Sequence, residues 1–246
     1  MNSIINLRFI RQVNAVLFLT ATVIHSAWAG QVVTGKIIID GVIVGDGNNQ
    51  VVNGSAIMAH EKRQVGAFDR VITEGSIDIR YQQSAVTNVE ISGDQTILPL
   101  IKIEANAGLL RISSTESYQS RLPIVVTMSA PHIKQLTMNG AGDAELNDLD
   151  EDEFKLELNG SGNVVANGRA GEVIVKIDGS GDVNAKNLIS QKADVSINGS
   201  GNLALTTSQY LKTNLVGSGD VTYYGHPKQV EKQMNGSGEI KSGDAL

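Results

Sequence analysis

The chain has 246 residues, of which 41% are hydrophobic, 19% charged and 4% aromatic, with 26 glycines and no cysteine. This length is sufficient for one or two domains with a buried core, and the lack of cysteine excludes disulfides, Cys-ligated zinc, iron–sulfur clusters and cysteine nucleophiles. Twenty basic residues against 26 acidic ones give a net charge of −6, which argues against a nucleic-acid partner, because such a partner needs a basic face.

Residues 1–29 are typical of a secretory signal peptide. Arg8 and Arg11 form a basic start, an apolar run covers residues 13–24, and Ala27-Trp28-Ala29 provides an A-x-A cleavage site. The apolar run is shorter than the roughly 20 residues that a membrane-spanning helix needs. We therefore predict export to the periplasm or the outer cell surface, with no transmembrane segment in the mature chain.

Residues 30–63 form a short β-patterned preface, in which apolar runs are separated by glycines. From residue 64 a β-solenoid domain is predicted to extend to residue 246. Its first part is irregular, with turns expected at Gly75, at 92–94 and at 107–108. The alternation of apolar and polar residues predicts strands over 68–73, 77–81, 86–91, 98–104, 109–112 and 122–128.

A regular repeat occupies residues 131–246. A Gly-x-Gly motif followed by Asp, Asn or Glu occurs six times, at intervals of 20, 19, 20, 18 and 19 residues. Such a fixed period indicates a repeat architecture. Glycine is suited to these turns because it reaches backbone angles that strain other residues, so a structural role is predicted for the first glycine of each motif. These glycines are Gly140, Gly160, Gly179, Gly199, Gly217 and Gly236.

The residues around each motif alternate with a period of two. Mainly apolar residues stand two and four positions before the first glycine and four and six positions after it, with polar residues between. Each unit is therefore expected to contain two strands with one buried face each. Stacking of equivalent turns explains the constant period, so we predict an all-β, right-handed parallel β-helix-like solenoid. An antiparallel meander or sandwich is the alternative, since Asn-Gly between alternating runs also signals a hairpin.

The same residues carry a resemblance to a known bacterial family. The segments 66–72, 77–79, 89–94 and 109–112, followed by the Gly-Ser-Gly-Asp/Asn series and residues 221–227, resemble the family named "putative auto-transporter adhesin, head GIN domain". The resemblance covers roughly residues 63–246. It implies an exported, β-helical envelope protein, and it supplies no catalytic residues.

The sequence offers turn residues and one aromatic segment as candidate sites. Each corner supplies one acidic or amide residue, whereas a calcium-binding β-roll needs a nine-residue G-G-x-G-x-D repeat, so Asp143, Asp182 and Asp220 are expected to stabilise turns rather than bind a metal. No cofactor is expected. The acidic run 148–153 is interpreted as a solvated loop. Because exposed aromatic side chains beside a turn can anchor a partner, Tyr224 and His226 are the candidate partner-binding residues.

The sequence thus favours an exported, non-enzymatic protein of the cell envelope, with an adhesin-like interaction or structural role. The expected partner is another envelope or surface molecule, or a second copy of the chain through exposed strand edges. A periplasmic glycan-binding or polysaccharide-active β-helix protein is the alternative. Enzymatic activity is not expected, because the short repeats leave little room for the long loops that build a catalytic cleft.

Overall fold

A computed structural model of the protein describes residues 36–39, 42–46 and 51–243. The chain divides into two units, Met1–Asn48 and Asn49–Leu246. In the first unit, β1 (Lys36–Ile39) and β2 (Val42–Asp46) form an antiparallel hairpin. The predicted signal peptide lies outside the described residues. The second unit contains the repeat and the irregular region that precedes it.

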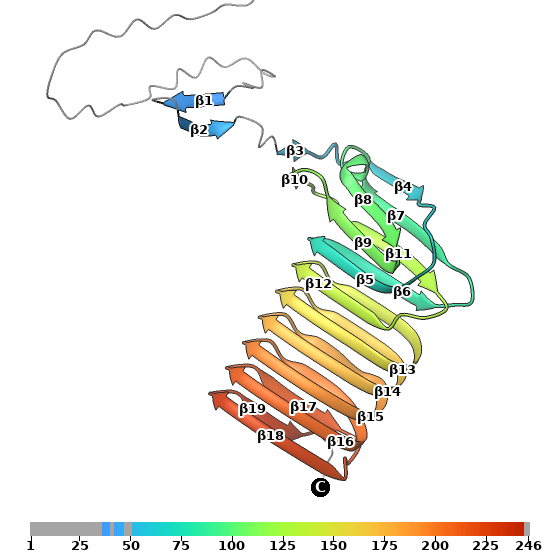
Figure 1. Cartoon of the computed structure of the whole chain (residues 1–246), viewed down its shortest axis with the longest axis vertical. Coiled ribbons are helices and arrows are strands. Elements are labelled where there is room, and N and C mark those ends of the chain that lie inside the picture. The colour runs from blue at the N-terminus through green and yellow to red at the C-terminus, as the bar shows by residue number, and fades with distance from the viewer. Residues whose placement is uncertain (1–35, 40–41, 47–50, 244–246) are drawn as a thin grey trace, which may run out of the picture. The chain divides into compact units, whose positions relative to one another are not determined.

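The repeat forms a stack of parallel coils, a β-solenoid of about five turns (Figure 1). Each coil is closed by a Gly-x-Gly corner, and the long strands bend at the opposite side of the coil, which we call the far corner. The strands of the stack are β12 (Gln135–Gly140), β13 (Ala144–Gly160), β14 (Val164–Gly179), β15 (Val183–Gly199), β16 (Leu203–Gly217), β17 (Asp220–Tyr224), β18 (Gln229–Gly236) and β19 (Glu239–Ser242).

The corners are stacked in register, as the constant period predicts. Gly140 pairs with Gly160, Gly160 with Gly179, and Gly179 with Gly199, and the remaining corners continue the column. All of these pairings are parallel. The prediction of a parallel solenoid is therefore confirmed for the repeat, and the antiparallel alternative is wrong there.

The core is built from four inward-facing columns of side chains. They correspond to the positions two and four before, and four and six after, the first glycine of each corner. Burial of this apolar surface is the main stabilising contribution that the repeat can provide. In coils β13 to β16 the columns are almost entirely buried; their members are Leu156, Val175, Val195, Thr213, Leu158, Ile177, Ile197, Leu215, Ala144, Val164, Val183, Leu203, Leu146, Ala166, Ala185 and Leu205.

The first coil of the stack comes from a distant part of the sequence. Strands β5 (Phe68–Gly75) and β6 (Ile77–Gln83) form a coil whose corner contains Gly75 and Ser76. β5 pairs with β12 and β6 pairs with β13, so that Gly140 stacks on Gly75. The segment between residues 84 and 134 therefore interrupts the sequence of the solenoid without interrupting its stack.

This interrupting segment covers the N-terminal end of the solenoid and contains antiparallel pairs. β9 (Gly108–Ser114) and β11 (Ile124–Ala130) add a parallel layer to β5 and β6 on the side away from β12 and β13. β8 (Ile101–Asn106) pairs antiparallel with β9, and β7 (Asn88–Asp94) pairs antiparallel with β11. Beyond β7 lies β4 (Met58–Lys62), which is antiparallel to β7. β3 (Val52–Asn53) pairs with β10 (Tyr118–Gln119). Residues 51–62 of the predicted preface thus join this end.

Two local predictions in this region are wrong. Residues 98–100 form a 3-10 helix (η1, Leu98–Leu100) instead of the start of a strand, since Pro99 has no backbone N–H to donate to a neighbouring strand. The turn expected at 92–94 begins after Asp94, whose carboxylate accepts the backbone N–H of Thr96 at 2.9 Å. The turns at Gly75 and at Ala107-Gly108 are confirmed by positive φ angles.

Candidate interaction surface

A ladder of side-chain hydrogen bonds runs along the residues that follow the corners. In each coil an Oδ1 atom accepts the backbone N–H of the equivalent residue in the next coil. Asp143 accepts from Asn163 at 2.8 Å, and Asp182 accepts from Asn202 at 2.9 Å. The amide residues fit between the carboxylates because each amide also donates its own Nδ2. The ladder consists of Asp78, Asp143, Asn163, Asp182, Asn202, Asp220 and Glu239.

The strand segments after the corners present an outward surface that we call the ladder face. Beside the ladder lie two further columns with mainly small or uncharged side chains. A shallow groove of about 470 Å³ follows the ladder and the first of these columns over several coils. The two columns are Glu145, Val165, Asn184, Ala204 and Thr222, and then Asn147, Asn167, Lys186, Thr206 and Tyr224.

Tyr224 lies near the C-terminal end of the ladder face, whereas His226 lies in the turn beyond it. The Nζ atom of Lys186 is 4.2 Å from the centroid of the Tyr224 ring, which is a cation–π geometry. Tyr224 is half-buried, and Gly243 packs against its ring. His226 is exposed and has a positive φ of 51°. The two residues are thus close in sequence, but only Tyr224 belongs to the ladder face.

The opposite outward surface, formed by the segments before the corners, differs in its charges. Lys155 pairs with Glu157 at 2.7 Å, Lys176 with Asp178 at 2.6 Å, and Lys212 with Asp194 at 3.2 Å. The hydrogen bond from Lys155 lowers the pKa of Glu157. The charges on this surface are thus engaged in ion pairs with one another, whereas the ladder face carries mainly uncharged side chains beside its ladder.

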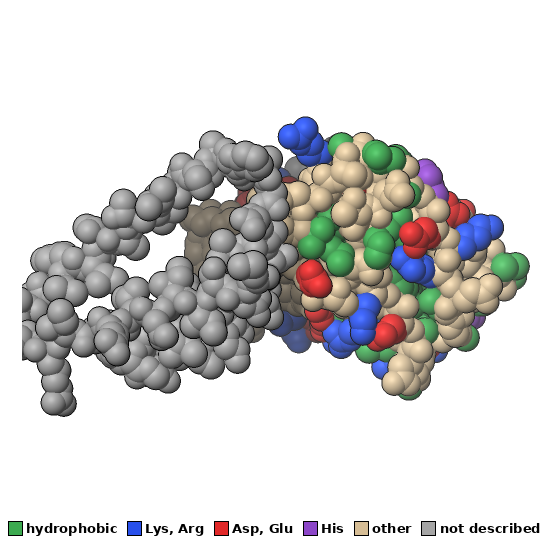
Figure 2. Space-filling model, turned by 90° about the horizontal axis from the view of Figure 1, so that it is seen from above, with side chains coloured by type: hydrophobic (Ala, Val, Ile, Leu, Met, Phe, Trp, Pro, Cys, Tyr) green, Lys and Arg blue, Asp and Glu red, His purple; other side chains and the backbone are tan. Residues whose placement is uncertain are grey.

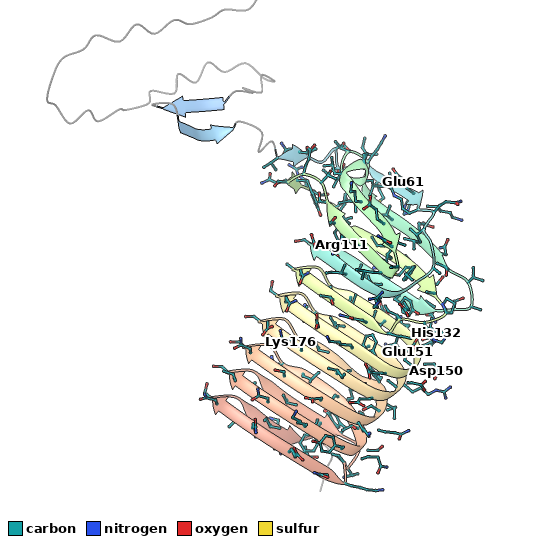
Figure 3. The ribbon with its side chains drawn as sticks, viewed as in Figure 1. Glu61, Arg111, His132, Asp150, Glu151 and Lys176 are labelled. Atoms are coloured by element: carbon teal, nitrogen blue, oxygen red, sulfur yellow. The ribbon has the colours of Figure 1, made fainter. Side chains whose placement is uncertain are left out.

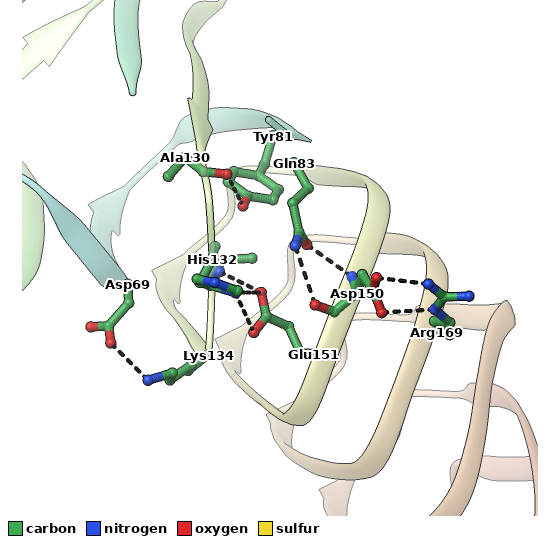
Figure 4. A network of polar contacts seen from close by, with 10 residues as sticks. Asp69, Tyr81, Gln83, Ala130, His132, Lys134, Asp150, Glu151 and Arg169 are labelled. Atoms are coloured by element: carbon green, nitrogen blue, oxygen red, sulfur yellow. Dashed lines mark hydrogen bonds and ion pairs between the residues drawn. The ribbon is translucent and has the colours of Figure 1, made fainter. Parts of the chain in front are cut away.

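A separate polar network lies at the far corners, where the interrupting segment meets the repeat (Figure 3). The Nδ1 atom of His132 is 3.2 Å from Oε2 of Glu151, and Glu151 also accepts the backbone N–H of the buried Ile133 at 3.0 Å. Beside this pair, Asp150 receives two hydrogen bonds of 2.7 Å from Arg169 (Figure 4). The network therefore fixes the end of the interrupting segment to the first regular coil.

The acidic run 148–153 is part of a strand, β13, instead of a loop. Asp148, Asp150, Asp152 and Glu153 are exposed, as expected of a solvated segment, whereas Glu151 is buried and belongs to this network. The side chain of Glu151 is only 4% exposed. The buried carboxylate is stable there because it accepts hydrogen bonds. Burial, and secondarily the charge of Glu151, raises the pKa of Tyr81, whose hydroxyl donates to Ala130.

The His132–Glu151 pair has no nucleophile beside it within the described part of the chain. None of the described serine, threonine or tyrosine hydroxyls hydrogen-bonds to His132. A Ser–His–Asp arrangement needs such a hydroxyl next to the imidazole. Among the described residues there is also no cluster of three or more His, Asp or Glu side chains able to hold a metal ion.

Glu151→Ala is expected to destabilise the protein by about 1–3 kcal/mol, because the N–H of Ile133 loses its acceptor in a buried position. Glu151→Gln keeps an acceptor oxygen and is expected to lose less. Chemical denaturation at neutral pH measures both. Equal stability of wild type and Glu151→Ala would contradict a structural role for this carboxylate.

The comparisons with known proteins agree with the observed fold. Residues 67–227, more than half of the chain, match the family described as "putative auto-transporter adhesin, head GIN domain". The chain belongs to this family. A comparison of this chain with curated proteins found no match. The resemblance of the sequence to the GIN-domain family is thereby confirmed.

Two solved structures of bacterial proteins share this fold. A crystal structure from Bacteroides fragilis NCTC 9343, described as a "putative adhesin", is 22% identical and has a TM-score of 0.66, covering 78% of this chain and 99% of that chain. A second "putative adhesin", from Parabacteroides merdae ATCC 43184, is 20% identical with a TM-score of 0.51 and covers 78% and 99%. At these identities the likeness concerns the fold alone. The described residues of this GIN-domain protein include no helix that could span a membrane.

Sequence reasoning missed two features of this molecule. The ladder begins at Asp78, which accepts the N–H of Asp143 at 2.9 Å, and this rung is 65 residues away in the sequence. The second feature is a groove at the N-terminal end, which is lined by residues 114 and 116–124. The sequence does contain a signal for the Asp78 rung of the ladder. The segment Gly75-Ser76-Ile77-Asp78 matches the motif Gly-Ser-Gly-Asp in three of four positions.

Proposed function

We propose that this chain is an exported, non-enzymatic, adhesin-like module of the cell envelope that binds its partner through the ladder face. The observation that carries the proposal is the continuity of this face. The same type of side chain recurs in coil after coil, with a shallow groove alongside. A partner with its own repeating groups would form many weak contacts, whose combined strength rises steeply with their number.

Export rests on the predicted signal peptide and on the naming of the family. Mature residues from Gly30 onwards would then reach the periplasm or the outer cell surface. The non-enzymatic character is supported by the His132–Glu151 pair, which holds Ile133 in place and lies beside no hydroxyl nucleophile. Tyr224 is the aromatic member of the ladder face and its proposed anchor at the C-terminal end; His226 is kept as a partner-binding candidate.

The partner surface can be tested with two matched arginine variants. Asn184 and Asn214 are both exposed and point outward, but Asn184 lies on the ladder face and Asn214 on the opposite surface. The mature protein, fluorescently labelled, is titrated onto washed cells that export it. We expect Asn184→Arg to bind at least about tenfold more weakly, which corresponds to about 1.4 kcal/mol, and Asn214→Arg to bind like the wild type.

Two results would contradict this proposal. Saturable binding that both variants retain would exclude the ladder face as the contact surface. Recovery of the protein only in the cytoplasmic fraction, after cross-linking in intact cells and fractionation, would exclude the envelope role. A melting temperature that is the same in both variants and the wild type ensures that lost binding does not reflect unfolding.

A further inference from the structure

A groove of about 1120 Å³ lies at the N-terminal end of the solenoid. We call it the corner groove. Its floor contains Gly75 and Ser76, the corner of the first coil. In the neighbouring layer, formed by β9 and β11, residues 115–123 take the place of the three-residue corner and form one wall, while residues 53–56 form the other. The corner groove is thus built where the solenoid departs from its repeat.

The two walls are held together by the protein itself. The N–H of Val52 donates to Ser117 O at 2.9 Å, and the N–H of Gly54 donates to Gln119 O at 2.8 Å. The fully buried carboxylate of Asp94 accepts the N–H groups of Ser55 and Ala56. These contacts fix the shape of the corner groove before a ligand arrives, which reduces the ordering cost of binding.

The lining combines an aromatic ring with polar groups that the protein does not use. Tyr118 is half-buried and packs against the core while it lines the corner groove. Ser114 and Ser120 donate their hydroxyls to neighbouring carbonyls. In contrast, the side chains of Ser76, Ser117 and Gln119 have no hydrogen-bonding partner within the described part of the chain.

The charges along the corner groove nearly balance. Glu74 forms an ion pair with Arg111, and the other charged lining residues are Glu116 and Arg121, one of each sign. On the face shown in Figure 2, acidic and basic side chains likewise lie interspersed among uncharged ones. A strongly anionic or cationic ligand would therefore find little complementary charge here. A lipid chain would need a predominantly apolar lining.

We propose that the corner groove binds a short stretch of a neutral oligosaccharide. The ring of Tyr118 would pack against the apolar face of one sugar, because aromatic rings offer apolar area with a fixed orientation. Ser76, Ser117 and Gln119 would exchange hydrogen bonds with the sugar hydroxyls, since serine and glutamine both donate and accept. This site is separate from the ladder face and goes beyond the proposed contact with an envelope partner.

A bulky side chain introduced at Ser76 should block the corner groove, and the same substitution at the corner of another coil provides the control. Ser76 and Ser180 occupy the same position in two coils, and both are exposed, but only Ser76 lies in the corner groove. The mature protein is first applied to a microarray of neutral hexopyranose oligomers. The retained oligomer is then titrated by calorimetry into wild type, Ser76→Trp and Ser180→Trp. We expect Ser76→Trp to weaken binding at least tenfold and Ser180→Trp to leave it unchanged.

A second variant tests the chemistry without adding bulk. Gln119→Ala is expected to weaken binding of the same oligomer severalfold, whereas Asn184→Arg on the ladder face leaves it unchanged. The proposal is overturned if no neutral oligomer is retained by the wild type, or if Ser76→Trp binds like the wild type. It is also overturned if Ser180→Trp loses binding to the same extent. Asn184→Arg tests binding to cells through the ladder face, whereas Ser76→Trp tests binding of the oligomer in the corner groove. Either proposal can therefore fail without the other.

Discussion

Replacement of Gly199 by alanine is expected to lower the free energy of unfolding by about 3 kcal/mol or more. A Cβ atom on Gly199 would lie 2.0 Å from the carbonyl oxygen of Gly179 in the preceding coil, and a backbone atom cannot move aside as a flexible side chain would. The φ of Gly199 is also 139°, a conformation that strains any other residue. Overpacking typically costs about 1–3 kcal/mol, and a residue held in a sparsely populated backbone conformation costs about 1–3 kcal/mol more.

Ser200→Ala serves as the control for this change. Ser200 is the middle residue of the same corner and is exposed, so its truncation is expected to change stability by less than about 0.5 kcal/mol. Urea unfolding followed by circular dichroism measures both variants. An unfolding midpoint of Gly199→Ala that equals the wild-type midpoint would show that the corners are not packed in contact with one another.

The second large effect is expected for Asp94, the buried carboxylate behind the corner groove. It accepts hydrogen bonds from the N–H groups of Ser55, Ala56 and Thr96 and from the hydroxyl of Ser55. Burial alone would raise the pKa of Asp94, but these hydrogen bonds outweigh it and the pKa is lowered. Asp94→Asn replaces an acceptor with a donor and is expected to reduce the Tm at pH 7 by about 5–10 °C.

The sign of the pH dependence follows from the lowered pKa. A carboxyl group whose pKa is lower in the folded state stabilises the protein above its unfolded pKa of about 4, and this contribution is lost as the pH falls through the folded pKa. The difference in Tm between wild type and Asp94→Asn should therefore shrink between pH 5 and pH 2. The exposed Asp152 provides the control, since Asp152→Asn should leave the Tm nearly unchanged at pH 7. A Tm difference between wild type and Asp94→Asn that stays constant from pH 5 to pH 2 would contradict the stabilising role of the ionised Asp94 carboxylate.

The repeat could be predicted from the sequence because each of its residues has one local role. The period fixed the stacking, the alternation fixed which side chains are buried, and the glycines fixed the corners. The prediction also included stabilisation of the turns by Asp143, Asp182 and Asp220, but their hydrogen bonds reach the next coil instead of their own turn. That detail depends on the register between coils, which the spacing alone does not define.

The N-terminal end could not be predicted in the same way, because its partners are remote in sequence. Ile77 stands where the later corners have their second glycine, so the first coil lacks the full motif. Ile77 pairs with Ile124, which follows a wide turn. The side chain of Ile77 is fully buried in the core. The corner groove arises from the same wide turn. The conformation of such a turn is not encoded by a repeated sequence motif, so the sequence pattern does not predict it.

The interleaving of distant segments at this end has a consequence for how the protein folds. The coil of β5 and β6 has β9 and β11 on one side and β12 and β13 on the other. It cannot acquire both neighbours until the chain has been synthesised as far as Asn147, 64 residues beyond the end of β6 at Gln83. Slow closure of these long loops should therefore limit the rate of folding, after which the regular coils can add one by one toward the C-terminus, each using the finished coil before it as a template.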